Sequence, residues 1–150
     1  MACANYWTTP FQVGSHHLAR GFVDAGWTVG FVSDPISPLH LLGHARKELA
    51  SRFRLYRQGG LWDLGKKLWA YVPAALATPR NEPLLRSRAL ERGWAHLTWP
   101  SVGGVVRNHG FGDVDLLYCD SPKHLSWLSQ VARVRTVFRV ADNTSGFGRT

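Results

Sequence analysis

The chain has 150 residues, of which 45% are hydrophobic and 19% charged, a balance that predicts one globular domain with a buried core and excludes a disordered chain. No apolar run approaches the roughly 18 residues that a membrane-spanning helix needs, and the first residues lack a signal-peptide pattern, so we expect a cytoplasmic protein. The only cysteines, Cys3 and Cys119, fall in predicted strands and are expected to be buried free thiols.

The net charge of +8 is concentrated in the middle of the chain. Residues 44–92 contain eleven Lys or Arg against four acids, interleaved with aromatic residues such as Trp62 and Trp69. This pattern suits an anionic membrane surface or a nucleic-acid backbone. A solvated basic face, with its aromatic side chains in the core, remains the alternative interpretation.

Residues 11–35 predict a loop, a helix and a strand. Gly14 supplies a flexible loop residue and Ser15 an N-cap hydroxyl, and an apolar stripe at helical spacing follows as far as Gly26. The nearly continuous apolar run at 27–33 is typical of a strand buried on both faces. With a strand at 2–6, this forms a βαβ unit, whose first loop lies at the carboxyl edge of a parallel sheet, where ligands bind.

The middle third predicts a helix at 43–56, a short amphipathic piece at 61–67, a third strand at 68–72, and helices at 84–96 and 102–108. His40 and His44 are four residues apart and could ligate a metal from one helix face. We expect no metal there, because Gly43 interrupts the helix and no glutamate follows in the zinc-protease pattern.

The last third predicts a second βαβ unit, with a strand at 114–119, a helix at 123–132 that begins after a proline turn, and a strand at 134–141. Together the segments predict an α/β fold, a Rossmann-like open parallel sheet with helices on both faces. The five predicted strands, numbered along the chain, are expected in the spatial order 3-2-1-4-5.

Polar residues follow four of the predicted strands, and the ends of parallel strands converge on one crevice. These residues are Gly14, Ser15, His16 and His17, then Ser33 and Asp34, then Asp120 and Ser121, and finally Asp142 and Asn143.

A carboxylate in such a crevice can act as a general base, and the helix N-terminus beside Gly14 can hold a phosphate. An aspartate after a strand is more commonly a cap or turn former, and His16 could instead be a buried histidine bonded to backbone. The glycine fingerprint of NAD-binding proteins and the Walker lysine of ATPases are both missing.

The runs G-S-H-H-L-A and G-W-T-V-G-F-V-S resemble the N-terminal βαβ unit of GT-B glycosyltransferases. The later segments LLYCDSPKHLSWL and VFRVADNTSGF resemble bacterial members that assemble surface polysaccharides, including the xanthan glucuronosyltransferase type. In those enzymes the N-terminal half binds the acceptor and the C-terminal half binds the sugar nucleotide. The resemblance implies that 1–150 is a single GT-B N-terminal domain, a fragment without its donor-binding domain that is inactive by itself.

The resemblance also implies an activity, the transfer of a sugar from a nucleotide-sugar donor to a glycan or lipid-linked acceptor in surface polysaccharide synthesis. It makes Asp142 the first candidate for the catalytic base and His16 the second, with Gly14, Ser15 and His17 forming an acceptor or phosphate-binding loop. Asp34, Asp120, Ser121 and Asn143 are the further polar residues at strand ends.

We expect no cofactor and no metal, and a peripheral contact of residues 44–92 with the anionic inner face of the plasma membrane. The alternative function is a non-catalytic basic module that binds anionic membrane or nucleic acid, and nucleic acid is the partner we expect least.

Overall fold

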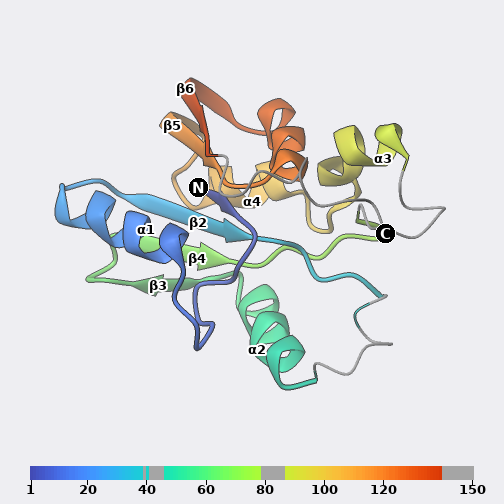
Figure 1. Cartoon of the computed structure of the whole chain (residues 1–150), viewed down its shortest axis with the longest axis horizontal. Coiled ribbons are helices and arrows are strands. Elements are labelled where there is room, and N and C mark those ends of the chain that lie inside the picture. Colours follow the sequence, from blue (N-terminus) through green and yellow to red (C-terminus); the bar gives the residue numbers. More distant parts are fainter. Residues whose placement is uncertain (39, 41–45, 79–86, 140–150) are drawn as a thin grey trace, which may run out of the picture.

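The computed structural model describes residues 1–38, 40, 46–78 and 87–139, and within them it contains a six-stranded sheet in the order β3-β4-β2-β1-β5-β6. Its strands are β1 (Ala2–Cys3), β2 (Val29–Ser33), β3 (Leu61–Asp63), β4 (Leu68–Tyr71), β5 (Asp113–Cys119) and β6 (Ala132–Phe138). All neighbouring strands are parallel except β3 and β4, whose arrows point in opposite directions in Figure 1.

The predicted order of the five parallel strands is confirmed, because the prediction corresponds to β4-β2-β1-β5-β6. The sequence predicted only a short amphipathic piece at residues 61–67, with no type of element assigned, and this piece forms the antiparallel edge strand β3 and a tight turn. Gly59 and Gly60 have φ of 68° and 107°, and Leu64 and Lys66 also have positive φ, so the backbone reverses twice within eight residues. All three β3 residues are exposed, which explains why no strand-like burial pattern marks them.

The helices are α1 (Gly14–Asp24), α2 (Arg46–Arg57), α3 (Arg88–Gly93) and α4 (Val102–Asn108), with 3-10 helices η2 (Trp94–Leu97) and η3 (Pro122–Ser129). Alternate strand residues face opposite ways, and β2, β4 and the last three residues of β5 (117–119) are buried on both sides. Phe31 and Leu68 pack against Ala19 of α1 on one face. On the other face, Trp69 belongs to the cluster that contains Val102 of α4. Helices therefore cover both faces, as predicted.

Four predicted elements differ from the prediction in their bounds or in their type. The first strand ends at Cys3 instead of residue 6, the helix predicted at 123–132 is the 3-10 helix η3, and β6 begins earlier, at Ala132. The predicted helix at 84–96 is split into α3 and η2, and residues 84–86 lie outside the described chain. The indole nitrogen of Trp94 donates to the Lys123 carbonyl oxygen at 2.8 Å, and this tertiary bond holds the start of η2 against η3.

Among the described residues of the segment 44–92, basic residues lie at both ends of β4 and not on one surface. Lys66 and Lys67 lie in the turn between β3 and β4, at the amino end of β4, whereas α2 packs through Leu55 on Val72, just beyond the carboxyl end of that strand. Figure 1 shows α2 beside the end of the sheet where β3 begins. Of the aromatic residues in this segment, Trp69 and Tyr71 are buried in the core, as the alternative interpretation expects, whereas Trp62 is 41% exposed.

Candidate functional site

The carboxyl ends of β1, β2 and β5 meet at one edge of the sheet. The Asp34 amide donates to the Cys3 carbonyl oxygen at 2.9 Å, and the Asp120 amide donates to the Ala2 carbonyl oxygen at 3.2 Å. The Ala4 amide then donates to Oδ1 of Asp120 at 3.0 Å. Two carboxylates from strands far apart in the sequence are thereby placed on either side of β1.

His124, in η3, lies between these two carboxylates. Its Nε2 is 2.7 Å from Oδ1 of Asp34, and its Nδ1 is 3.2 Å from Oδ1 of Asp120, within ion-pair distance although without good hydrogen-bond alignment. Lys123 forms an ion pair with the other oxygen of Asp34, and Ser15 donates from Oγ to Oδ2 of Asp120 at 2.7 Å. We call Ser15, Asp34, Asp120, Lys123 and His124 the carboxyl-edge cluster.

Electrostatics within this cluster favour the charged forms of three buried groups. Burial alone would lower the pKa of His124, but the adjacent Asp120 and Asp34 outweigh it and raise that pKa above its usual value. Burial alone would raise the pKa of Asp34 and of Asp120. His124, which is hydrogen-bonded to Asp34 and within ion-pair distance of Asp120, acts together with the charge of Lys123 beside Asp34 and the Ser15 hydroxyl on Asp120; these interactions outweigh burial and lower both pKa values. The cluster therefore holds two carboxylates balanced by an imidazolium and an ammonium.

A cavity of about 250 Å³ opens beside the cluster. Asp34 and Lys123 line it together with Arg52 of α2, whose Nη2 donates to the carbonyl oxygens of Asp34 at 2.7 Å and Pro35 at 3.1 Å. Trp94 contributes to the wall. A cavity with carboxylate, ammonium and guanidinium groups can accept hydrogen bonds from ligand hydroxyls and donate hydrogen bonds to ligand oxygens.

His16 is fully buried and is bonded to backbone through both ring nitrogens. Nδ1 accepts the amide of Val13 at 3.2 Å, and Nε2 lies 3.0 Å from the carbonyl oxygen of Tyr6. The ring packs between Trp7 and Phe31, with centroid distances of 5.5 and 5.2 Å. In this arrangement His16 stabilises the first turn of α1, because its side chain accepts a hydrogen bond from the backbone amide of the N-cap residue Val13.

The other residues of the predicted loop lie around the start of α1. Val13 is the N-cap instead of Ser15, so the prediction of a capping serine was wrong; the Ser15 hydroxyl bonds to Asp120 instead. Gly14 and His17 are exposed. A Cβ at Gly14 would be 2.5 Å from Nη1 of Arg139, so this guanidinium lies against the first residue of the helix.

The structure brings Ser15, Asp34 and Asp120 into one cluster, and Ser121 precedes η3, where its carbonyl oxygen accepts the His124 amide at 2.9 Å. Asp142 and Asn143 lie outside the described residues, so their predicted roles stay predictions. Sequence reasoning missed His124 and Lys123. The only local signal in the sequence was that His124 comes four residues after Asp120. The second partner of His124, Asp34, is 90 residues away from it in the sequence.

A Rossmann-like sheet with a charged cluster and a cavity at its carboxyl edge is typical of ligand-binding α/β domains. A family model described as the N-terminal domain of the glucuronosyltransferase GumK matches residues 1–149, and the chain belongs to this family of glycosyltransferase domains. Searches of curated proteins and of solved structures gave no match. The family match supports the GT-B resemblance and gives no support to the basic binding module.

Proposed function

We propose that this chain is the acceptor-binding part of a glycosyltransferase that moves a sugar from a nucleotide-sugar donor to a glycan or lipid-linked acceptor in surface polysaccharide synthesis. The observation that carries the proposal is the family match over residues 1–149. A GT-B enzyme binds its donor in a second domain, so the 150-residue chain by itself is expected to be inactive. The proposal includes no metal and no cofactor.

The carboxyl-edge cavity is the proposed place for part of the acceptor. Acceptors of this class carry many hydroxyl groups, and lipid-linked ones also carry phosphates. Asp34 can accept hydrogen bonds from hydroxyls, while Lys123 and Arg52 offer positive charge toward phosphate oxygens. The Arg139 amide donates to the Cys119 carbonyl oxygen at 2.9 Å, so the described chain reaches this same edge three residues before Asp142 in the sequence.

Asp142 is the proposed general base, which takes the proton from an acceptor hydroxyl as that oxygen attacks the anomeric carbon of the donor sugar. The surroundings of His16 favour this choice, because both ring nitrogens of His16 already have backbone partners and its side chain is fully buried. A base must reach the proton that it removes. His16 could do so only after giving up the bonds that begin α1.

The test is sugar transfer by the full-length protein, with thermal unfolding measured in parallel. Asp142→Asn keeps the shape of the side chain and loses its basicity, so turnover should fall by roughly a hundredfold to ten-thousandfold at unchanged stability. Asp113→Asn, at the exposed amino end of β5, is the matched control and should keep normal turnover. His16→Ala should lower the melting temperature. Near-normal turnover of Asp142→Asn, with loss of transfer in a folded His16→Ala variant, would assign the base to His16.

We also propose that the domain works at the cytoplasmic face of the membrane, in contact with anionic lipid. None of the helices among the described residues is long and apolar enough to cross a bilayer, so such a contact would be peripheral. Leu76 and Trp99 are 73% and 75% exposed beyond the carboxyl end of β4, and α2 supplies Arg54 and Arg57 at that end. Exposed apolar side chains with basic residues suit the lipid headgroup region.

A further inference from the structure

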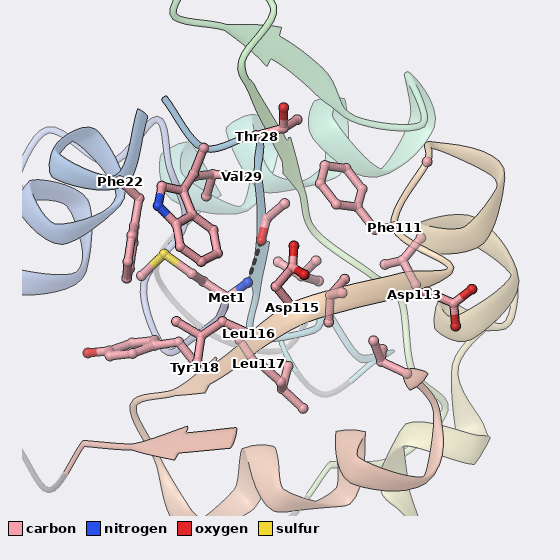
Figure 2. Close-up of a pocket in the computed structure, with 18 of the residues that line it drawn as sticks. Met1, Phe22, Thr28, Val29, Phe111, Asp113, Asp115, Leu116, Leu117 and Tyr118 are labelled. Atoms are coloured by element: carbon pink, nitrogen blue, oxygen red, sulfur yellow. Dashed lines mark hydrogen bonds between the residues drawn. The ribbon is translucent and has the colours of Figure 1, made fainter. Parts of the chain in front are cut away.

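Two cavities of the described chain differ in the chemistry of their walls. The larger, of about 630 Å³, lies at the amino edge of the sheet, between the first residues of β2 and β5. Its acidic side chains are Asp113 and Asp115, and the described residues that line it include no lysine or arginine. Figure 2 shows both carboxylates among apolar side chains such as Phe22 and Phe111. This cavity therefore does not suit an anion.

The smaller cavity, of about 250 Å³ at the carboxyl edge, has a positively charged wall. Its charged side chains are Asp34, Lys123 and Arg52. Beside Asp34, the pair of His124 and Asp120 adds one cation and one carboxylate, because their surroundings favour the charged forms of both. Three cations therefore stand against two carboxylates. The volume is below the roughly 300–1,000 Å³ of pockets for drug-sized ligands, so we expect a small anionic group.

The main hydrogen-bond acceptors of this wall already have partners within the protein. Oδ1 of Asp34 is 2.7 Å from Nε2 of His124, and Oδ2 forms the ion pair with Lys123. The carbonyl oxygens of Asp34 and Pro35 accept hydrogen bonds from Nη2 of Arg52. An ammonium group carries several N–H donors, whereas Lys123 has one carboxylate partner among the described residues, and its side chain is 34% exposed. Donors of Lys123 therefore remain for a ligand.

His40 adds to the donor character of the wall. Its Nδ1 accepts the Ser37 amide at 3.0 Å, so the neutral ring carries its proton on Nε2. A sugar hydroxyl both donates and accepts hydrogen bonds, whereas the charged oxygens of a phosphate ester only accept them. A wall of N–H donors with a net positive charge therefore favours phosphate over a sugar ring.

We propose that the carboxyl-edge cavity is a phosphate subsite, which holds a phosphate ester of the lipid-linked acceptor, and that Lys123 is the residue that binds the phosphate oxygens. The inference rests on the proposed function, which supplies this acceptor. Asp34 fixes the Lys123 ammonium at the wall and His124 in turn holds Asp34, so the cation is ordered before the ligand binds. A charge-assisted hydrogen bond from lysine to phosphate is about twice as strong as one between neutral groups.

The first test is the binding of inorganic pyrophosphate to the 150-residue chain, measured by calorimetry at pH 7 and low salt. In the proposed transferase the sugar nucleotide binds in another domain, so its diphosphate site does not contribute. Lys123→Met keeps the length of the side chain and removes its charge, so the affinity should fall at least about tenfold. Lys123→Arg keeps the charge and should retain most of the affinity. Lys67→Met, at an exposed lysine between β3 and β4, is the matched control and should bind normally. No binding, or equal affinity of the Lys123→Met chain, would overturn the subsite.

NMR of the natural chain keeps the subsite testable if Lys123→Met does not fold. His40 lines the carboxyl-edge cavity and His109 lines the larger cavity, so each ring reports on one of them. Pyrophosphate should shift the ring signals of His40 and leave those of His109 in place. Equal shifts of both rings, or a shift of His109 alone, would overturn the subsite.

The second test identifies the phosphate that the subsite binds. It uses the full-length protein and two acceptors with the same glycan, one linked to a lipid through phosphate and one a simple alkyl glycoside. Lys123→Met should raise the KM at least about tenfold more for the phosphate-linked acceptor than for the alkyl glycoside, with kcat little changed.

Three other results of this test would overturn the acceptor phosphate as the occupant. An equal rise in KM for both acceptors would place a sugar ring in the cavity, and a raised KM for the donor alone would assign the phosphate to the nucleotide. Unchanged KM values with weaker binding to phospholipid vesicles would assign it to a lipid headgroup. If the natural full-length protein transfers sugar to neither acceptor, the proposed function is wrong, whereas pyrophosphate binding to the 150-residue chain still decides whether the phosphate subsite exists.

Discussion

Replacement of His124 by glutamine should be among the most destabilising single changes at the carboxyl edge. The His124 side chain is 1% exposed and lies between Asp34 and Asp120, whose side chains are 19% and 8% exposed. Glutamine is similar in size but uncharged, so it leaves two buried carboxylates with one cation, Lys123. Removal of one partner from a buried ion pair costs about 3–5 kcal/mol. Because Asp34 keeps Lys123, we expect about 3 kcal/mol, or roughly 6–12 °C in melting temperature.

The pH dependence of this loss has a definite sign. The pKa of His124 is raised above 6.5 in the folded state, so its stabilisation is complete below pH 6.5 and declines as the pH rises through the folded pKa. The pKa values of Asp34 and Asp120 are lowered below 3.8, so their stabilisation is complete above pH 3.8 and is lost as the pH falls through their folded pKa values. The cluster therefore contributes most between about pH 4 and 6.5.

Urea unfolding at pH 5.5 and pH 9 measures both effects. The difference in unfolding free energy between the natural chain and His124→Gln should be larger at pH 5.5 than at pH 9. His17→Gln, an exposed histidine on α1, is the control and should show no such difference. A loss in unfolding free energy under about 1 kcal/mol for His124→Gln, or the same loss at both pH values, would refute the reasoning. Either result would be expected if His124 were uncharged in the folded protein and formed no ion pair with Asp34 or Asp120.

Gly60→Ala should cost about 2 kcal/mol or more in urea unfolding, since φ is +107° and the added Cβ would lie 2.3 Å from Nε1 of Trp69. Gly21 has open space around it within α1, so Gly21→Ala should be neutral or stabilising by up to about 1 kcal/mol. Equal effects of Gly60→Ala and Gly21→Ala on the unfolding free energy would contradict this account. In liposome flotation, the protein should bind vesicles that contain anionic lipid and leave neutral vesicles free, and a variant with Arg54→Glu and Arg57→Glu should bind less. Equal binding to both kinds of vesicle would refute the membrane proposal.

The amino-acid sequence by itself determined the parallel sheet and its strand order. The apolar runs at 27–33 and 114–119 have few polar positions, because strands covered by helices on both faces need apolar side chains on both sides. The right-handed connection between parallel strands then leaves few possible orders. The same rule placed Asp34 and Asp120 at one edge, because residues that follow parallel strands emerge on the same side.

Only the tertiary structure decided what each polar residue contacts. His124 lies next to Asp34 because η3 packs against β1 and β5 at the edge of the sheet where β2 also ends, and no local pattern relates residues 90 positions apart. Ser15 bonds to Asp120 instead of capping α1, since Val13 and His16 already close the first turn. Edge strand β3 likewise forms because it pairs with β4 on the side of β4 that does not face β2. This pairing uses backbone N–H and C=O groups, which do not depend on the side chains, so the exposed residues of β3 give no sequence pattern that predicts it.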